Sequence, residues 1–358
     1  MERRRPPIVG QVLSRSASRL ILKPEMSFIS SGSILANLAL SQRGRDGGWA
    51  RGYIGNIVGD GATGKTIMAL EACASAILLG VHPVYNNVEG KMDFPLEDMY
   101  GPNFRSSVEW IRSETVEAMG ADLHHRLLHL KEPILWILDS VDSMVSEAGK
   151  KRAEKKANGK SRGASDDEEG DGGNKKNKGT YGTEKAKYFS SEFFNNLCNM
   201  MEGRDATLLF ISQVRENLKA GLFGKKYYRT GGKGFDFYTH QVGWLYHTEK
   251  LEREVRKHKR SYGVGARLYI DRNKVAPPYR GAEFPIIFDR GIGDEEAMCD
   301  YLKIDNAKEI LAEIDAEIRR GMPRAEIQCY NDLCQMLEEE WKAEEEAIKS
   351  ERPPKYQI

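Results

Sequence analysis

Cysteine is scarce in this chain of 358 residues, and its five copies are scattered. Cys73, Cys198, Cys299, Cys329 and Cys334 form no Cys-x-x-Cys pair. This scatter argues against a zinc site and against a disulfide framework. Reduced thiols of this kind are typical of a cytoplasmic protein, and we expect that location.

Long apolar runs and a strong net charge are lacking as well. No stretch approaches the roughly 18 apolar residues of a membrane span, and the N-terminal Arg3-Arg4-Arg5 precedes Pro6-Pro7 rather than the apolar core of a signal peptide. Lys and Arg total 54 and Asp and Glu 53, which gives a net charge of +1. We therefore expect no membrane partner, and a nucleic-acid site would need a local basic patch.

The most informative stretch is a glycine-rich loop, Gly-Asp-Gly-Ala-Thr-Gly-Lys-Thr at residues 59–66. It fits the spacing G-x-x-x-x-G-K-[ST], follows an apolar run and precedes helix-forming residues, which is the context of a phosphate site. Glycines let backbone N–H groups surround an anion, and a helix N-terminus adds partial positive charge. We expect a nucleoside triphosphate to contact Gly59, Asp60, Gly61, Ala62, Thr63, Gly64, Lys65 and Thr66. Lys65 would reach the β- and γ-phosphates, and Thr66 would ligate Mg²⁺.

Alternating strands and helices around this loop predict an α/β fold with a parallel sheet. Buried strands are predicted at 84–88, 108–111, 134–139 and 206–213. The third of these ends on Asp139, where a carboxylate would hold Mg²⁺ through water. Ser113 is the expected N-cap of the helix that follows the second.

The later part of the chain, from about residue 242, no longer alternates strands with helices. Runs at 242–246, 266–270 and 284–288 follow one another without long helices, which predicts an antiparallel extension of the sheet. From about residue 294 the pattern is helical and ends in a highly charged helix.

Two segments depart from this regular alternation. Residues 147–187 hold almost no large apolar side chain, which predicts a disordered, charged insert. Residues 214–238 interleave cations, aromatic rings (Phe235 among them) and glycines, the ingredients of a loop that binds single-stranded nucleic acid. A merely flexible surface loop is the plainer alternative. The candidate DNA contacts are Arg215, Lys219, Phe223, Lys225, Lys226, Tyr227, Tyr228, Arg229, Gly231, Gly232 and Lys233.

The order of these pieces resembles the RecA family of homologous-recombination ATPases over residues 26–300. Besides the phosphate loop, the resemblance rests on FISSGS at 28–33, NVEGKMD at 87–93, LDSV at 138–141, FISQVR at 210–215, TGGKGFDFY at 230–238 and RNKVAPPY at 272–279. It implies a RecA-like ATPase core whose mostly parallel central sheet is extended by antiparallel strands and has helices on both faces. Residues 1–25 would dock on a neighbouring subunit, and residues 301–358 would form a small, charged helical region.

The resemblance also assigns roles to single residues. Glu89 is implied to be the general base that activates water, and Asp93 to lie near the adenine, with Phe94 or Tyr100 as the candidate that stacks on it. Gln213 is implied to sense the γ-phosphate and, through Phe235, to order the DNA loop. Arg272 and Lys274 are implied to reach the nucleotide of the neighbouring subunit. The insert at 147–187 stands at the first DNA-binding loop of the family, and residues 214–238 form the second.

The implied activity is that of a DNA-stimulated ATPase using ATP and Mg²⁺. Such a protein would polymerise on single-stranded DNA as a helical filament and pair it with homologous duplex DNA, in recombination and repair. The departures from the family motifs suggest a divergent, phage-encoded member acting in the bacterial or phage-infected cytoplasm. Two alternatives stay open: a helicase or packaging motor on the same core, and a mediator that binds ATP and DNA without exchanging strands.

Overall fold

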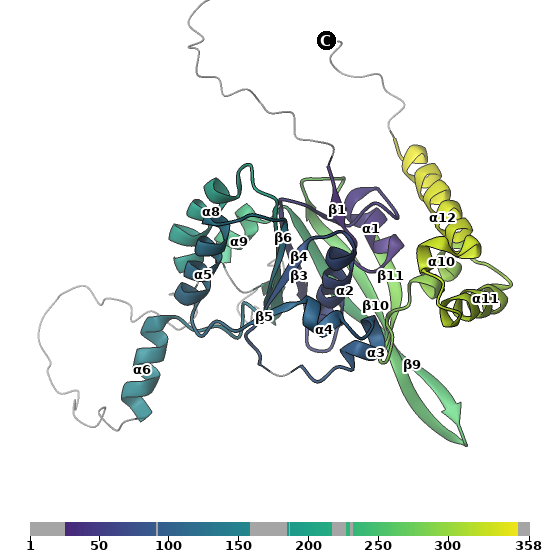
Figure 1. Ribbon diagram of the computed structural model, residues 1–358, viewed down its shortest axis with the longest axis horizontal. Helices are drawn as coiled ribbons and strands as arrows, with labels where there is room; N and C mark the ends of the chain where they lie inside the picture. The colour runs from purple at the N-terminus through teal and green to yellow at the C-terminus, as the bar shows by residue number, and fades with distance from the viewer. Residues whose placement is uncertain are drawn as a thin grey trace, which may run out of the picture.

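A single large sheet runs through the body of the protein, with helices on both of its faces (Figure 1). The computed structural model describes residues 26–90, 92–157, 185, 187–216, 227–229 and 232–349. The strand order is β12-β11-β10-β9-β3-β7-β6-β4-β5, and β8 pairs with β7 outside this path.

The parallel half of the sheet carries the predicted buried strands. They are β3 (Ile54–Gly59), β4 (His82–Asn87), β5 (Glu109–Ile111), β6 (Ile134–Asp139) and β7 (Ala206–Glu216), and β9 (Gln241–Val255) runs parallel to β3. Along β6, Trp136 and Leu138 face one hydrophobic cluster, whereas Leu135 and Ile137 face the other. Strands buried on both faces are apolar without alternation. The predicted α/β fold is confirmed.

The other half of the sheet is antiparallel, as predicted. It consists of β9, β10 (His258–Asn273), β11 (Gly281–Ile287) and β12 (Gly291–Ile292). β9 and β10 have 15 and 16 residues, so both are much longer than the apolar runs that predicted them. Their outer parts are charged and exposed, and cross-strand hydrogen bonding rather than burial makes them strands.

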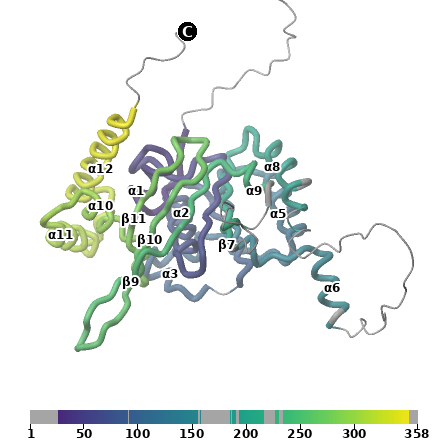
Figure 2. Tube along the Cα trace, turned by 180° about the vertical axis from the view of Figure 1, so that it is seen from behind, coloured from purple at the N-terminus to yellow at the C-terminus, as the bar shows by residue number. Residues whose placement is uncertain are grey.

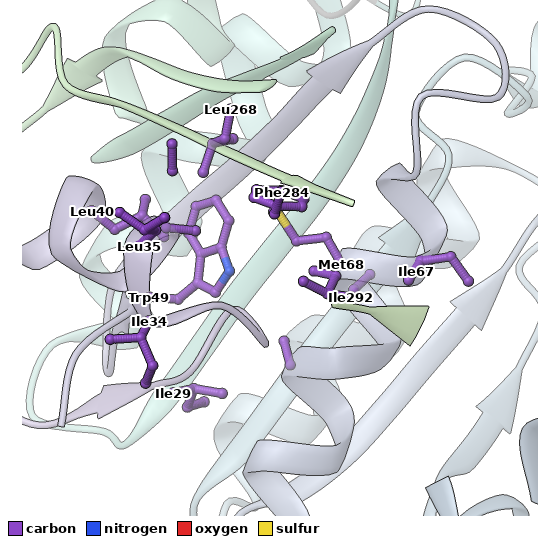
Figure 3. Packing of buried hydrophobic residues seen from close by; sticks show 14 of the residues in the cluster. Ile29, Ile34, Leu35, Leu40, Trp49, Ile67, Met68, Leu268, Phe284 and Ile292 are labelled. Carbon is purple, nitrogen blue, oxygen red and sulfur yellow. The ribbon is translucent and has the colours of Figure 1, made fainter. Parts of the chain in front are cut away.

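One face of the sheet is covered by α1 (Ile34–Ser41), α2 (Lys65–Leu78), α3 (Leu96–Tyr100) and α4 (Phe104–Ser107), with the short pair β1 (Phe28–Ile29) and β2 (Trp49–Ala50) beside them. Figure 3 shows Met68 of α2 next to Phe284 and Ile292 from the antiparallel half. The helix that begins at the phosphate loop is thereby packed against the outer strands as well as the central ones.

The opposite face is covered by α5 (Val116–Leu128), a π-helix at Phe189–Phe193, α8 (Phe194–Met201) and α9 (Gly232–Tyr238). Phe235 of α9 is fully buried there, with ring centroids 5.0 Å from Phe189 and 4.9 Å from Phe194. Its assignment to the aromatic set of a DNA-binding loop is therefore wrong, because it is part of the core.

The N-cap of α5 also differs from the prediction. Thr115 caps the helix by accepting a hydrogen bond from the Ala118 amide at 3.1 Å. Ser113, the expected cap, instead accepts a hydrogen bond from the Asn86 amide group at 2.7 Å. Serine and threonine are both good N-cap residues. Thr115 is the cap here because the Ser113 hydroxyl is already bonded to Asn86 on β4.

The charged insert begins as a helix rather than as a loop. Residues Glu147–Ala157 form α6, eleven residues long, so the predicted disorder of 147–187 is wrong for this part. Residues 158–184 lie outside the described residues. The chain has returned to the body at Lys185, whose buried ammonium donates to the carbonyls of Val141, Asp142 and Met144 at 2.9 to 3.1 Å.

The C-terminal region is helical, as predicted. It contains α10 (Asp294–Leu302), α11 (Ala307–Arg319), a 3₁₀ turn at Arg324–Glu326 and α12 (Gln328–Ala347). Ile314, Leu337 and Trp341 belong to the same hydrophobic cluster as α1 and α2. The expected division at residue 301 falls inside α10. These helices pack on the core. None of the described helices is both long and apolar enough to cross a bilayer.

Candidate functional site

The glycine-rich loop lies at the carboxyl edge of the parallel sheet, because β3 ends at Gly59 and α2 begins at Lys65. Gly64 has φ +92° directly before the helix, a conformation that side chains rarely adopt. A Cβ atom at Gly59 would lie 2.6 Å from Thr63 Oγ1, and one at Gly64 would lie 2.1 Å from Ile286 Cδ1. The loop is therefore wound so tightly that only glycine fits at these two positions.

Lys65 lies against the inside of this loop. Its ammonium donates to the carbonyl of Asp60, and Thr63 Oγ1 donates to the same carbonyl at 3.0 Å. Burial lowers the pKa of Lys65, and the carboxylates of Asp139 and Glu89 act in the opposite direction. A lysine beside a glycine-rich loop at a helix N-terminus is the arrangement that binds a polyphosphate.

Asp139, at the end of β6, faces the first turn of α2. Its Oδ2 accepts hydrogen bonds from Thr66 Oγ1 at 3.0 Å and from the Tyr85 hydroxyl at 2.7 Å. Burial raises the pKa of Asp139, and the hydrogen bonds from Tyr85 and Thr66 partly offset this effect. The two predicted Mg²⁺ residues are thus in direct contact.

The donor set fits Mg²⁺. The described residues contain no group of three or more His, Cys, Asp or Glu side chains arranged to hold a metal. Mg²⁺ at phosphoryl-transfer sites binds through one or two side chains, substrate oxygens and several waters, so the hydroxyl of Thr66 and the carboxylate of Asp139 suffice.

Glu89 follows β4 and lies beside the ends of β6 and β7. Its Oε1 accepts hydrogen bonds from the hydroxyls of Ser140 at 2.8 Å and Ser143 at 3.2 Å. Gln213 Nε2 lies 3.5 Å from the same oxygen. The Gln213 backbone amide donates to Asp142 Oδ2 at 2.6 Å, which fixes the backbone at this point of β7. Two residues that are 124 positions apart in sequence are therefore in contact at one edge.

The three candidates for contact with the adenine, Asp93, Phe94 and Tyr100, differ in how exposed their side chains are. Asp93 and Phe94 are exposed, with 37% of Phe94 accessible. Tyr100 points inward, because its hydroxyl donates to Glu71 Oε1 at 3.3 Å and its ring lies 4.6 Å from that of Phe104. Phe94 is thus the better candidate for stacking on a base.

Arg272 and Lys274 lie at the opposite end of the sheet from the phosphate loop. β9 aligns Val242 with Asn56 and Leu245 with Gly59, and Arg272 pairs with Val242. From Asn56 to Gly59 the strand spans roughly 10 Å at about 3.3 Å per residue. Arg272 Nη2 donates to the Phe237 carbonyl at 3.2 Å. The two cations therefore lie on residues set back along the strands from the phosphate loop of their own subunit.

The predicted DNA contacts are only partly described. Arg215 pairs with Asp142 at 3.3 Å. Tyr227 and Tyr228, on β8 (Tyr227–Arg229), are 52% and 50% exposed. Gly232 and Lys233 begin α9. Lys219, Phe223, Lys225, Lys226 and Gly231 lie outside the described residues.

Arg229 does not fit its predicted role. The side chain is buried, and its Nη2 bonds to Asp236 Oδ1 at 2.9 Å and to Thr239 Oγ1 at 3.2 Å, while Nη1 donates to Asn56 Oδ1. A guanidinium with these partners is not available to a DNA phosphate. We correct its assignment: Arg229 fastens the end of the loop to β3.

Sequence reasoning missed several polar residues of the site. Tyr85, Ser140, Ser143 and Asp142 hold Asp139, Glu89 and Gln213 in place. Each lies within a few residues of the carboxyl end of β4 or β6. In the sequence, these residues could have been found only from their position, because polar residues near the carboxyl ends of parallel strands often belong to a ligand site.

Known proteins of the RecA family and one solved recombinase structure are similar to this chain. The model of the RecA N-terminal domain matches residues 169–293. Protein RecA of Porphyromonas gingivalis is 26% identical over 289 residues, which cover 79% of this chain and 72% of that protein. Protein RecA of Trichodesmium erythraeum is 25% identical over 272 residues, 76% of this chain and 66% of the relative. The crystal structure of the RadB recombinase aligns with a TM-score of 0.48 at 18% identity, covering 74% of this chain and 98% of that one. The matched domain and the long alignments show that this chain is similar to proteins of the RecA family over most of its length.

Proposed function

We propose that the protein is an ATP-dependent DNA recombinase, which polymerises on single-stranded DNA and promotes homologous pairing and strand exchange. Similarity to the RecA family supports a recombination ATPase at the family level. The observation that carries the finer proposal is the contact of Gln213 with Glu89, 3.5 Å between Nε2 and Oε1. Gln213 lies on β7, three residues before its end at Glu216, and the candidate DNA-binding segment follows directly.

In this proposal, the residues at the carboxyl edge of the sheet have separate roles in ATP hydrolysis. Glu89, held by two serine hydroxyls, would orient the attacking water and accept its proton. Lys65 and the loop amides would hold the β- and γ-phosphates in line with that water. Mg²⁺, held by Thr66 and through water by Asp139, would neutralise charge that develops on the phosphate oxygens.

Gln213 would couple this chemistry to DNA. Its side-chain amide contacts the carboxylate of Glu89, so a γ-phosphate beside Glu89 would compete for the same amide. A shift of Gln213 moves the end of β7, to which Tyr227 and Tyr228 are paired through β8. Order and disorder of a loop are a common readout of nucleotide state.

The position of Arg272 and Lys274 supports action between subunits. Because both lie at the far end of the sheet from their own phosphate loop, they would serve the nucleotide of a neighbour. An arrangement in which one surface of a subunit meets a different surface of the next gives a head-to-tail assembly, either a filament or a ring.

The first test measures ATP hydrolysis with and without single-stranded DNA, with electron microscopy of the same mixtures. We expect strong stimulation by DNA together with helical filaments, and loss of both in Lys65→Ala. Rings would favour the helicase or packaging motor. Turnover that ignores DNA, or ATP-dependent binding without strand exchange, would favour the mediator.

A second test asks whether the cations act between subunits. Lys65→Ala and Arg272→Ala should each be inactive alone. In an equal mixture, about a quarter of head-to-tail interfaces should combine an intact loop with an intact cation and recover activity. Lys65→Ala mixed with Glu89→Gln is the matched control and should recover none, because both changes damage the same side of the interface. Failure of the first mixture to exceed the control would contradict the proposal.

A further inference from the structure

The segment that follows β6, residues 140–144, connects Glu89 to the neighbouring strand. It lies between β6 and α6 in the chain, and Figure 2 shows α6 leading away from the body of the protein. The hydroxyls of Ser140 and Ser143 donate to Glu89 Oε1 at 2.8 and 3.2 Å. The Val141 amide donates to a carbonyl of β7 at 2.9 Å. A contact that fixes this segment therefore also fixes the carboxylate that is proposed to activate water.

A buried lysine from a distant part of the sequence holds the middle of this segment. Lys185 Nζ donates to the carbonyls of Val141, Asp142 and Met144 at 2.9, 3.1 and 3.1 Å, across 41 to 44 positions of sequence. An ammonium group has three N–H donors, so these carbonyls use all of them. Lys185 is only 8% exposed. It is thus fully engaged inside the protein and is not available to a nucleotide or to DNA.

Packing alone does not explain a lysine at this position. Burying a cation is unfavourable unless hydrogen bonds and an opposite charge compensate for the lost water. Burial lowers the pKa of Lys185, whereas the carboxylate of Asp142 acts in the opposite direction and Arg215 adds to the lowering. A methionine side chain of similar length would fill the same space without burying a charge. The three donated hydrogen bonds are what distinguishes lysine here.

Asp142 extends the same constraint to β7. Its carbonyl is one of the acceptors of Lys185, and its Oδ2 accepts a hydrogen bond from the Gln213 backbone amide at 2.6 Å. The Gln213 side chain in turn lies 3.5 Å from Glu89 Oε1. Two routes therefore lead from Lys185 to Glu89, one through the serine hydroxyls and one through β7.

We propose that Lys185 is a positioning residue for ATP hydrolysis, which fixes residues 140–144 so that Glu89 faces the attacking water. The inference rests on the proposed function and deepens it, because it names a residue that sets the rate of hydrolysis without touching the nucleotide. The hydrogen bonds of Lys65 and Thr66 involve none of residues 141–144, so ATP binding should not depend on Lys185.

The first test compares two replacements of Lys185. Lys185→Met keeps the length of the side chain and removes its donors. We expect kcat for ATP to fall about 10- to 100-fold, as for a reacting group displaced by about 1 Å, with KM unchanged within about twofold. Lys185→Arg keeps the charge and the donors and should retain more turnover. If only packing mattered, the larger arginine would be the worse replacement. Lys131→Met, at an exposed position, is the control and should leave kcat unchanged.

A double variant shows whether Lys185 acts through Glu89. Lys185→Met combined with Glu89→Gln should hydrolyse ATP no more slowly than Glu89→Gln alone, because the effects of residues that act as a unit do not multiply. If the two effects multiply, Lys185 acts on another step and the proposal is wrong.

Ser143→Ala tests the last contact separately. Ser143 is exposed, so this variant does not depend on whether Lys185→Met folds. Its kcat should fall about two- to tenfold, the rate equivalent of one hydrogen bond. Unchanged kcat in Ser143→Ala or in Lys185→Met, or a raised KM in place of a lowered kcat, overturns this inference and leaves the proposed function standing. Absence of ATP hydrolysis in the wild type overturns the proposed function, and this inference with it.

Discussion

Replacing Glu71 by glutamine should stabilise the protein in a way that depends on pH. Glu71 lies on α2 and is half-buried, and its Oε1 accepts hydrogen bonds from the Ile292 amide at 3.1 Å and the Tyr100 hydroxyl at 3.3 Å. Burial raises the pKa of Glu71 from 4.5 to about 7; these hydrogen bonds and Arg324 partly offset the rise, and Asp294 adds to it.

The sign of the effect follows from proton linkage. Below about pH 4.5 the carboxyl group is protonated in both the folded and the unfolded chain. Between about 4.5 and 7 the unfolded chain releases this proton while the folded one keeps it, so the free energy of unfolding falls as pH rises. Above about pH 7 the loss is complete and amounts to roughly 3 kcal/mol, at about 1.4 kcal/mol per pH unit.

Glutamine keeps the accepting oxygen but cannot ionise. The free energy of unfolding of Glu71→Gln minus that of the wild type should therefore increase by roughly 3 kcal/mol between about pH 4.5 and pH 8. Urea unfolding followed by circular dichroism at several pH values measures this difference, and other titrating groups cancel. Glu132→Gln, in an exposed loop, is the control and should show no such trend. A constant difference, or one that shrinks as pH rises, would refute the reasoning.

Other changes test the site itself. Glu89→Gln should lower turnover by about 10²- to 10⁴-fold, the usual contribution of a general base, while ATP-dependent DNA binding in a filter assay persists; normal turnover would exclude Glu89 from that role. Tyr227→Ala and Tyr228→Ala should each weaken binding of single-stranded DNA by about 1–3 kcal/mol in fluorescence titrations, and equal affinity would mean that neither ring stacks on a base. Arg229→Met should cost about 2 kcal/mol of stability, because Asn56 Oδ1 would lose its donor inside the core; a weakened salt slope without destabilisation would instead restore Arg229 to the DNA interface.

The elements that sequence predicts well are those defined by burial. β6 matches its predicted range, 134–139, because both of its faces are covered and every position is apolar until Asp139. The outer parts of β9 and β10, residues 252–261, escape prediction for the opposite reason. These residues are exposed and mostly polar, and they form strands only because β9 and β10 pair with each other. α6 is similar: seven of its eleven residues are charged, and Lys151 lies 4.0 Å from Glu147 one turn away.

The same distinction holds within the candidate site. The phosphate loop can be predicted because all its residues are consecutive, and glycine spacing reports their backbone conformation. Tyr85 and Ser140 cannot be predicted from local pattern, since they meet the site only when β4 and β6 lie side by side. At Arg229 and Phe235 the composition of the segment led to a wrong prediction of DNA contact. A cation and an aromatic ring in a glycine-rich segment can also anchor that segment to the core, as these two residues do.

The separation of Arg272 and Lys274 from the phosphate loop has a consequence for assemblies of any length. If each nucleotide site is completed by the next subunit, the two ends of an open filament cannot be equivalent. One terminal subunit exposes a nucleotide edge without cations, and the other exposes cations without a nucleotide. The first would hold ATP without hydrolysing it efficiently, whereas every interior site turns over. Subunits should therefore join and leave at different rates at the two ends, and the filament has a built-in direction.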